Sequence, residues 1–129
     1  MIPDNTFLIP KLSPGFEATI TLPGSKSIAL RQLAIAALVE GTSHITGIPK
    51  CDDTDAMIDC LRALGVAIDE DTSGTCITGP MDFGSGHVEL NSRMSGASTR
   101  LLIALAALRN GSTRIDGHES LRVRTNAPL

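Results

Sequence analysis

The sequence predicts a mixed α/β fold in which strands and helices alternate and a strand–helix–strand–helix–strand–strand unit repeats. Three observations lead to this prediction: apolar residues recur at helical spacing in three segments, short alternating segments lie between them, and two stretches match at a fixed offset. The chain has 129 residues, the length of one ordinary domain. With 42% hydrophobic and 19% charged residues, its composition is typical of a packed core and excludes a disordered chain.

Apolar residues spaced three and four positions apart predict three helices. In the first of them Leu30, Leu33, Ala34 and Ala37 fall on one face. A glycine follows the last apolar turn of each helix, which is typical of a C-cap. The helices are expected over residues 25–40, from a cap at Asp52 or Asp53 to Gly65, and from Ser95 or Gly96 to about Arg109.

Short apolar or alternating segments outside these helices predict strands. Residues 18–22 alternate and end at Pro23-Gly24, and a turn around residues 72–74 joins the two strands that follow the second helix. The strands are expected over residues 7–10, 18–22, 43–46, 66–69, 75–78, 87–90 and 112–116.

An internal repeat relates the two halves of the chain. Residues 41–47 (GTSHITG) match residues 111–117 (GSTRIDG) without a gap, and the same offset pairs Leu38 with Leu108. Chance agreement of two helix–turn–strand pieces is the alternative. The second copy stops at Leu129, where its second helix should begin, so we expect the chain to be a fragment of a longer protein.

Both copies place a turn of small residues between a strand and the start of a helix. In the first copy this segment is residues 22–27 (LPGSKS), followed by Arg31, and in the second it is residues 91–98 (NSRMSGAS), followed by Arg100. A helix N-terminus attracts anions through its unpaired N–H groups and its dipole. Ser27 lies four residues before Arg31 and shares a helix face with it. The pattern indicates a site for an anionic small molecule; a plain capped helix start is the alternative.

Composition excludes several other classes of protein. The net charge of −3 argues against a duplex nucleic-acid binder, and the longest apolar runs are far shorter than the roughly 20 residues that a membrane span needs. Cys51, Cys60 and Cys76 form no Cys-x-x-Cys pair and are expected to be small buried hydrophobes in a reducing cytosol. The three histidines are scattered, so we expect no metal site.

The segment over residues 22–27, with Arg31 after it, resembles the beginning of the 5-enolpyruvylshikimate-3-phosphate (EPSP) synthase family. The resemblance covers nearly the whole chain in the family's order and spacing. It implies an α/β (α+β) fold of βαβαββ units of the enolpyruvyl transferase type, with one complete unit and part of a second. The further motifs are residues 36–42, Asp52-Asp53, residues 61–66, Ser95-Gly96 with Arg100, and Leu121-Arg122 with Arg124.

The resemblance also implies a function. Enzymes of this family transfer the enolpyruvyl group of phosphoenolpyruvate to shikimate 3-phosphate and release phosphate; the resemblance implies a cytoplasmic enzyme of aromatic amino acid biosynthesis with no cofactor. Carried over by position, Lys26 should contact phosphoenolpyruvate, and Ser27 and Arg31 should contact shikimate 3-phosphate. Gly96 and Arg124 should join the phosphoenolpyruvate site, which glyphosate also occupies in this family.

The same resemblance divides the chain into three parts: residues 1–17 belong to the other domain of the full enzyme, residues 18–84 form the first unit, and residues 85–129 form a truncated second unit. The groups that move protons lie in later parts of the family sequence. We therefore expect no catalytic residue here, no turnover by this chain alone, and the remaining C-terminal part of the enzyme as its partner. The alternatives are a non-catalytic anion-binding module of the same fold and part of a UDP-N-acetylglucosamine enolpyruvyl transferase, whose early segment lacks the Ser-Lys-Ser pattern.

Overall fold

A computed structural model describes residues 6–125 of the chain. Helices and strands alternate in it over most of the chain, as the sequence predicts. In chain order the elements are α1 (Lys26–Ala36), β1 (Gly41–Ile45), α2 (Asp52–Ala63), β2 (Ala67–Asp71), β3 (Gly74–Gly79), β4 (Val88–Asn91), α3 (Gly96–Ala106), β5 (Thr113–Asp116) and α4 (Glu119–Arg122).

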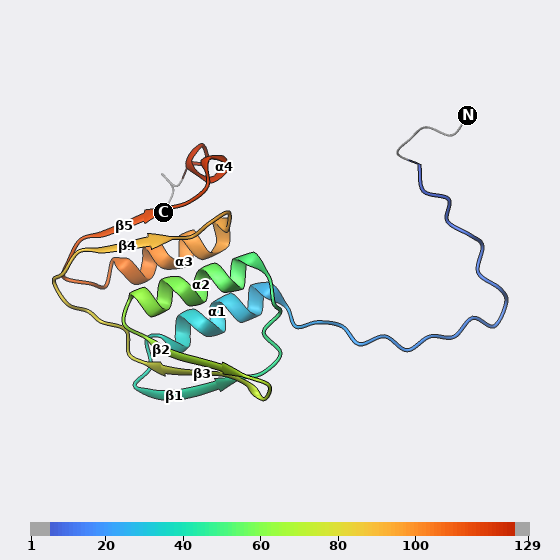
Figure 1. Cartoon of the computed structure of the whole chain (residues 1–129), viewed down its shortest axis with the longest axis horizontal. Helices are drawn as coiled ribbons and strands as arrows, with labels where there is room; N and C mark the ends of the chain where they lie inside the picture. The colour runs from blue at the N-terminus through green and yellow to red at the C-terminus, as the bar shows by residue number, and fades with distance from the viewer. Residues whose placement is uncertain (1–5, 126–129) are drawn as a thin grey trace.

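The three long helices form a layer between two small sheets (Figure 1). One sheet has the antiparallel strand order β1-β3-β2, in which Ser43 and Ile68 both pair with Ile77. The other sheet consists of β4 and β5, which run parallel, with Leu90 opposite Ile115. Helices α1, α2 and α3 all begin at the same end of this layer, at the right in Figure 1. Their positive dipole ends therefore point the same way.

The core is aliphatic and lies between the helices and the two sheets. Leu33, Met57, Leu61, Ile77 and Leu102 are completely buried in it. Burial of apolar side chains of this size stabilises a fold by roughly 1.5–3 kcal/mol each. The helices are therefore held by tertiary packing and not by their own propensity, and their starting points are fixed relative to one another.

Local capping decides where the helices start. The Ser25 side chain accepts a hydrogen bond from the Ile28 N–H and caps α1, and the Ser95 side chain accepts one from the Ser98 N–H and caps α3. The predicted cap of the second helix at Asp52 or Asp53 is wrong. Cys51 is the N-cap there, and its backbone N–H donates to the Thr54 hydroxyl. The two aspartates are freed for contacts with other elements.

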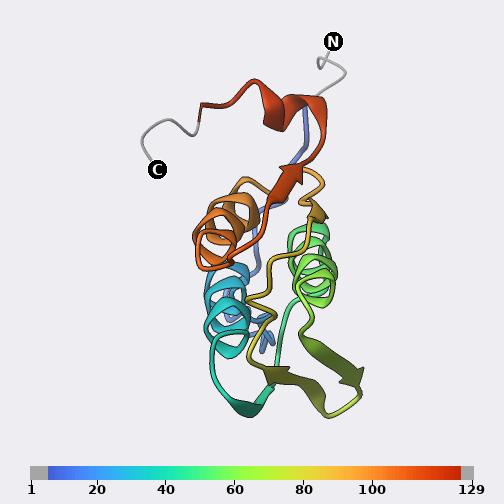
Figure 2. The same cartoon turned by 90° about the vertical axis from the view of Figure 1, so that its left-hand side faces the viewer.

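Two predicted strands near the N-terminus, over residues 7–10 and 18–22, do not form. Residues 6–23 extend away from the body of the molecule as a segment without regular structure (Figures 1 and 2). No described strand runs beside this segment, and Ile20 and Leu22 are about three-quarters exposed. A strand needs a partner for its N–H and C=O groups, and β1 pairs here with β3 on one side only. The short helix α4 lies just before the point at which the second helix of the second repeat copy is expected to begin.

Candidate functional site at the shared end of three helices

The first predicted motif lies at the start of α1, against the first turn of α2. Lys26 is the first residue of α1, and its Nζ lies 2.9 Å from Oδ2 of Asp53 on α2. The Lys26 side chain is half exposed, whereas that of Asp53 is 26% exposed. The first turns of α1 and α2 are thereby joined by an ion pair at the edge of the helix layer.

The second predicted motif lies at the start of α3, which the same turn of α2 supports. The hydroxyl of Ser98 donates to the backbone carbonyl of Asp53 at 3.1 Å. The Ser95 hydroxyl donates to Ser98 Oγ at 2.7 Å, and the Thr99 hydroxyl donates to the Ser95 carbonyl at 2.8 Å. Ser92, Ser95 and Ser98 are fully buried, and each of their hydroxyls has a partner. This network holds the first turn of α3 rigidly beside Asp53.

Gly96, the first residue of α3, lies beside Arg124. A Cβ added to Gly96 would lie 3.4 Å from Nη1 of Arg124 and 3.7 Å from Leu121 Cδ1, which is ordinary contact distance. The Arg124 guanidinium therefore sits at the N-terminus of α3. Positive charge from the arginine and the positive dipole end of the helix meet at this point.

Ser27 and Arg31 lie one helical turn apart on α1, as their spacing predicts. Nη1 of Arg31 donates to the Ser27 carbonyl at 2.7 Å. Both residues line an open cavity of about 230 Å³ between α1 and α3. Ala97 and Arg100 of α3 line the same cavity. The cavity thus connects the α1 residues with the α3 motif that contains Gly96.

The arginines divide into two groups by their partners. Those of the first group are held by other protein groups: Arg62, Arg93, Arg114 and Arg122 pair with carboxylates, and Arg109 is buried and donates to carbonyl and hydroxyl oxygens. Within residues 6–125, the second group forms no ion pair with a carboxylate. It consists of Arg31, Arg100 and Arg124, all of which lie around the starts of α1 and α3. Guanidinium groups without a protein carboxylate are available for an anionic ligand.

The Lys26–Asp53 pair is ionised on both sides. The hydrogen bond and the charge of Asp53 raise the pKa of Lys26 above its ordinary value. The pKa of Asp53 is lowered, first by the Ser95 hydroxyl and then by Lys26. The ammonium of Lys26 therefore stays charged throughout the physiological range, and the carboxylate that holds it stays charged as well.

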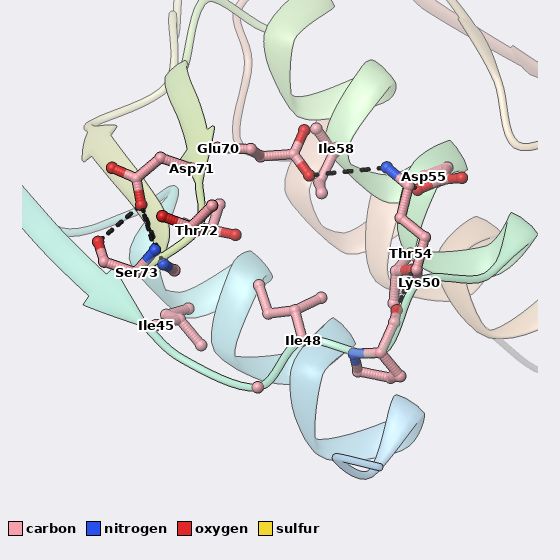
Figure 3. Close-up of a pocket in the computed structure, with 14 residues that line it drawn as sticks. Ile45, Ile48, Lys50, Thr54, Asp55, Ile58, Glu70, Asp71, Thr72 and Ser73 are labelled. Carbon is pink, nitrogen blue, oxygen red and sulfur yellow. Dashed lines mark hydrogen bonds and ion pairs between the residues drawn. The ribbon is translucent and has the colours of Figure 1, made fainter.

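A second cavity of about 230 Å³, between α2 and the turn that joins β2 to β3, has the opposite character (Figure 3). Asp55, Glu70 and Asp71 line it. Lys50 also lines it, with its Nζ 3.3 Å from Asp55 Oδ1 and 4.0 Å from Glu70 Oε1. This excess of carboxylates disfavours a phosphorylated ligand. None of the residues that the sequence identifies as binding residues lies there.

Asp53 was not identified from the sequence as a residue of the site, and Arg100 was placed in the second motif without a role of its own. Asp53 was expected only to cap its helix, and nothing in its local sequence signals a partner 27 positions away. Arg100 did have a signal, because the repeat matches it with Arg31. Over residues 6–125, no cluster of His, Cys, Asp and Glu could hold a metal ion. In the same part of the chain, every helix is too short or too polar to cross a membrane.

Comparison with known proteins agrees with this architecture. Residues 13–128 match the family model of EPSP synthase (3-phosphoshikimate 1-carboxyvinyltransferase). A 3-phosphoshikimate 1-carboxyvinyltransferase of Rhizobium etli is 46% identical over 108 residues, which cover 83% of this chain and 26% of that protein. The enzyme of the same name from Pseudomonas syringae pv. tomato is 35% identical over 134 aligned residues, covering 100% of this chain and 31% of its own length.

The fold has a counterpart among solved structures. EPSP synthase from Acinetobacter baumannii aligns with a TM-score of 0.68 and 29% sequence identity, over 81% of this chain and 24% of that one. The mixed arrangement of helices and sheets is therefore that of a known fold, as the sequence predicts. The chain spans between about a quarter and a third of the length of the relatives it matches.

Proposed function

Because the chain belongs to the EPSP synthase family, we propose that it forms the shikimate-3-phosphate-binding part of a 3-phosphoshikimate 1-carboxyvinyltransferase. The whole enzyme would transfer the enolpyruvyl group of phosphoenolpyruvate to shikimate 3-phosphate and release phosphate. The observation that supports this proposal is that the arginines without a carboxylate partner in the described part of the chain gather around the starts of α1 and α3.

The role proposed for each residue follows from the charged or hydrogen-bonding group with which it could bind an anion. Lys26 supplies a compact ammonium for phosphoenolpyruvate, and Arg124 a planar guanidinium at the start of α3. Gly96 leaves the backbone at that start open to close approach. Ser27 and Arg31 supply a hydroxyl and a guanidinium for shikimate 3-phosphate.

Such a site contributes to the reaction by positioning. Both substrates carry several negative charges and repel one another in solution. Fixed cations and helix dipoles offset this repulsion and hold the two molecules in register for transfer. The groups that move protons would come from the remaining C-terminal part of the enzyme, so this chain alone would bind and not turn over.

The proposal extends to the organisation of the enzyme. Residues 1–17 would belong to the other domain, and the exposure of Phe7 and Ile9, 92% and 88%, supports this assignment because an apolar segment needs a covering surface. Residues 18–84 and 85–129 would form the first unit and part of the second. The substrates are soluble metabolites, and we place the enzyme in the cytoplasm.

Titration of the isotope-labelled chain with shikimate 3-phosphate, followed by NMR, tests the proposal. We expect dissociation constants in the millimolar range, about −4 kcal/mol, because half of a cleft excludes little water. Arg31→Ala should weaken the binding of shikimate 3-phosphate about tenfold or abolish it, and Lys26→Ala should do the same to phosphoenolpyruvate in a parallel titration. Lys50→Ala is the matched control, since Lys50 is also a lysine but lines the acidic cavity. Equal binding by all four proteins would contradict the proposal.

A further inference from the structure

We propose that Asp53 is a positioning residue of the anion site, which holds the Lys26 ammonium of α1 against the first turn of α3 so that both act on one ligand. The inference rests on the function proposed above, because it concerns the same site. It adds a carboxylate to a site that is otherwise built from cations, hydroxyls and helix N-termini.

Asp53 contacts the other two helices through different atoms. Its Oδ2 accepts from Lys26 Nζ at 2.9 Å, and its backbone carbonyl accepts from Ser98 Oγ at 3.1 Å. The hydroxyl of Ser95, the N-cap of α3, is the first cause of the lowered pKa of that carboxylate. One residue of α2 thus sets the position of the lysine on α1 relative to the start of α3.

The neighbouring carboxylates of the same helical turn have other partners. Asp52 binds Arg93 at 3.0 Å, and Asp55 lies 3.3 Å from Lys50. The three residues share the same first turn, yet only Asp53 among them contacts both α1 and α3, through its side chain and its backbone carbonyl respectively. This difference separates a role in the site from the general stabilisation of a helix N-terminus by acidic residues.

The charge of Asp53 and its contact with Lys26 predict opposite effects on anion binding when the carboxylate is neutralised. A carboxylate next to a phosphate site repels the ligand, so by charge alone its removal should strengthen anion binding. A lysine side chain is flexible, however, and a free ammonium must be ordered again each time a ligand binds. If Asp53 keeps Lys26 in place, its neutralisation should weaken binding although it removes a negative charge.

The experiment compares Asp53→Asn with Asp55→Asn by NMR titration with phosphoenolpyruvate. Asparagine retains an oxygen acceptor and loses the charge in both variants. We expect about fivefold weaker binding for Asp53→Asn and a change within about twofold for Asp55→Asn. The double variant Lys26→Ala/Asp53→Asn should bind as Lys26→Ala alone does, because Asp53 acts through the lysine.

A second readout does not depend on a ligand. The pKa of Lys26, followed through its Cε chemical shift, should fall to its ordinary range in Asp53→Asn and be raised again in Asp53→Glu. Asp53→Ala, which also removes the carboxylate, replaces the asparagine variant if the latter does not fold. Tighter or unchanged binding by Asp53→Asn, or an unchanged pKa of Lys26, overturns the inference. A wild-type chain that binds neither substrate contradicts the proposed function, and the pKa of Lys26 then decides alone whether Asp53 holds the ammonium.

Discussion

The backbone of Gly24 lies against the carbonyl oxygen of Gly47, so closely that a Cβ on Gly24 would overlap with that oxygen. Gly24 thus packs directly against the loop that follows β1. The next two residues in the chain are Ser25, the N-cap of α1, and Lys26, the first residue of that helix. A close approach of two backbones therefore fixes where the first motif enters the site.

Gly24→Ala is expected to destabilise the chain, because the methyl group must displace backbone atoms. Overpacking of this kind costs about 1–3 kcal/mol. Gly86→Ala is a suitable control, since a Cβ at Gly86 meets no atom within 4 Å. Thermal unfolding followed by circular dichroism should give a clearly lower midpoint for Gly24→Ala alone. Equal midpoints would show that the 24–47 contact has no part in stability.

Gly96→Ala should behave in the opposite way. A Cβ at this position makes only ordinary contacts, 3.4 Å from Arg124 Nη1 and 3.7 Å from Leu121 Cδ1, and alanine is the better helix former by about 0.5–1 kcal/mol. The unfolding midpoint should stay the same or rise. Phosphoenolpyruvate should nevertheless bind more weakly, because the methyl group narrows the space at the start of α3. A variant that binds the ligand as the wild type does would remove Gly96 from the site.

Substitutions of Arg122 and Arg124 are expected to have different effects, the first mainly on stability and the second mainly on ligand binding. Arg122 donates from Nε and Nη2 to the two carboxylate oxygens of Asp116 at 2.8 and 2.9 Å, whereas Arg124 has no carboxylate partner in the part of the chain that the structure describes. Arg124→Ala should weaken phosphoenolpyruvate binding with little change in the unfolding midpoint. Arg122→Ala should loosen α4 and affect binding less. The reverse ranking in the titration would mean that Arg122 is the ligand-binding arginine.

The helices could be predicted from the sequence because their signals are local. The spacing of apolar residues predicts helix starts at Ser25 and at Ser95 or Gly96, and Ser25 and Ser95 are the N-caps of α1 and α3. The strand predicted over residues 18–22 depends on a neighbour along its edge, which alternation cannot reveal. Ion pairs between residues far apart in the chain could not be predicted from the sequence either. Two positions separate Arg122 from Arg124, and only the fold distinguishes the arginine bound by Asp116 from the one without a carboxylate partner among residues 6–125.

The contact between Asp116 and Arg122 also predicts an acid-sensitive step. The Arg122 guanidinium lowers the pKa of Asp116 to about 2. The pKa of an ordinary aspartate is about 4. The contribution of the Asp116 carboxylate to stability is therefore complete above that pH and is lost as the pH falls toward about 2. Unfolding midpoints between pH 5 and pH 2, which is about this window, should fall more steeply for the wild type than for Asp116→Asn. Titration of the Asp116 carboxyl by NMR near its ordinary value would contradict this expectation.

The central claim is that the starts of α1 and α3 form one anion site, and the backbone amide shifts on titration with phosphoenolpyruvate test it most directly. The amides of Lys26 and Ser27 on α1 and those of Gly96 and Ala97 on α3 should move together and fit a single dissociation constant. Amides that line the acidic cavity, such as that of Thr72, should stay in place. Shifts at one helix start only, or two different constants for the two starts, would contradict the account.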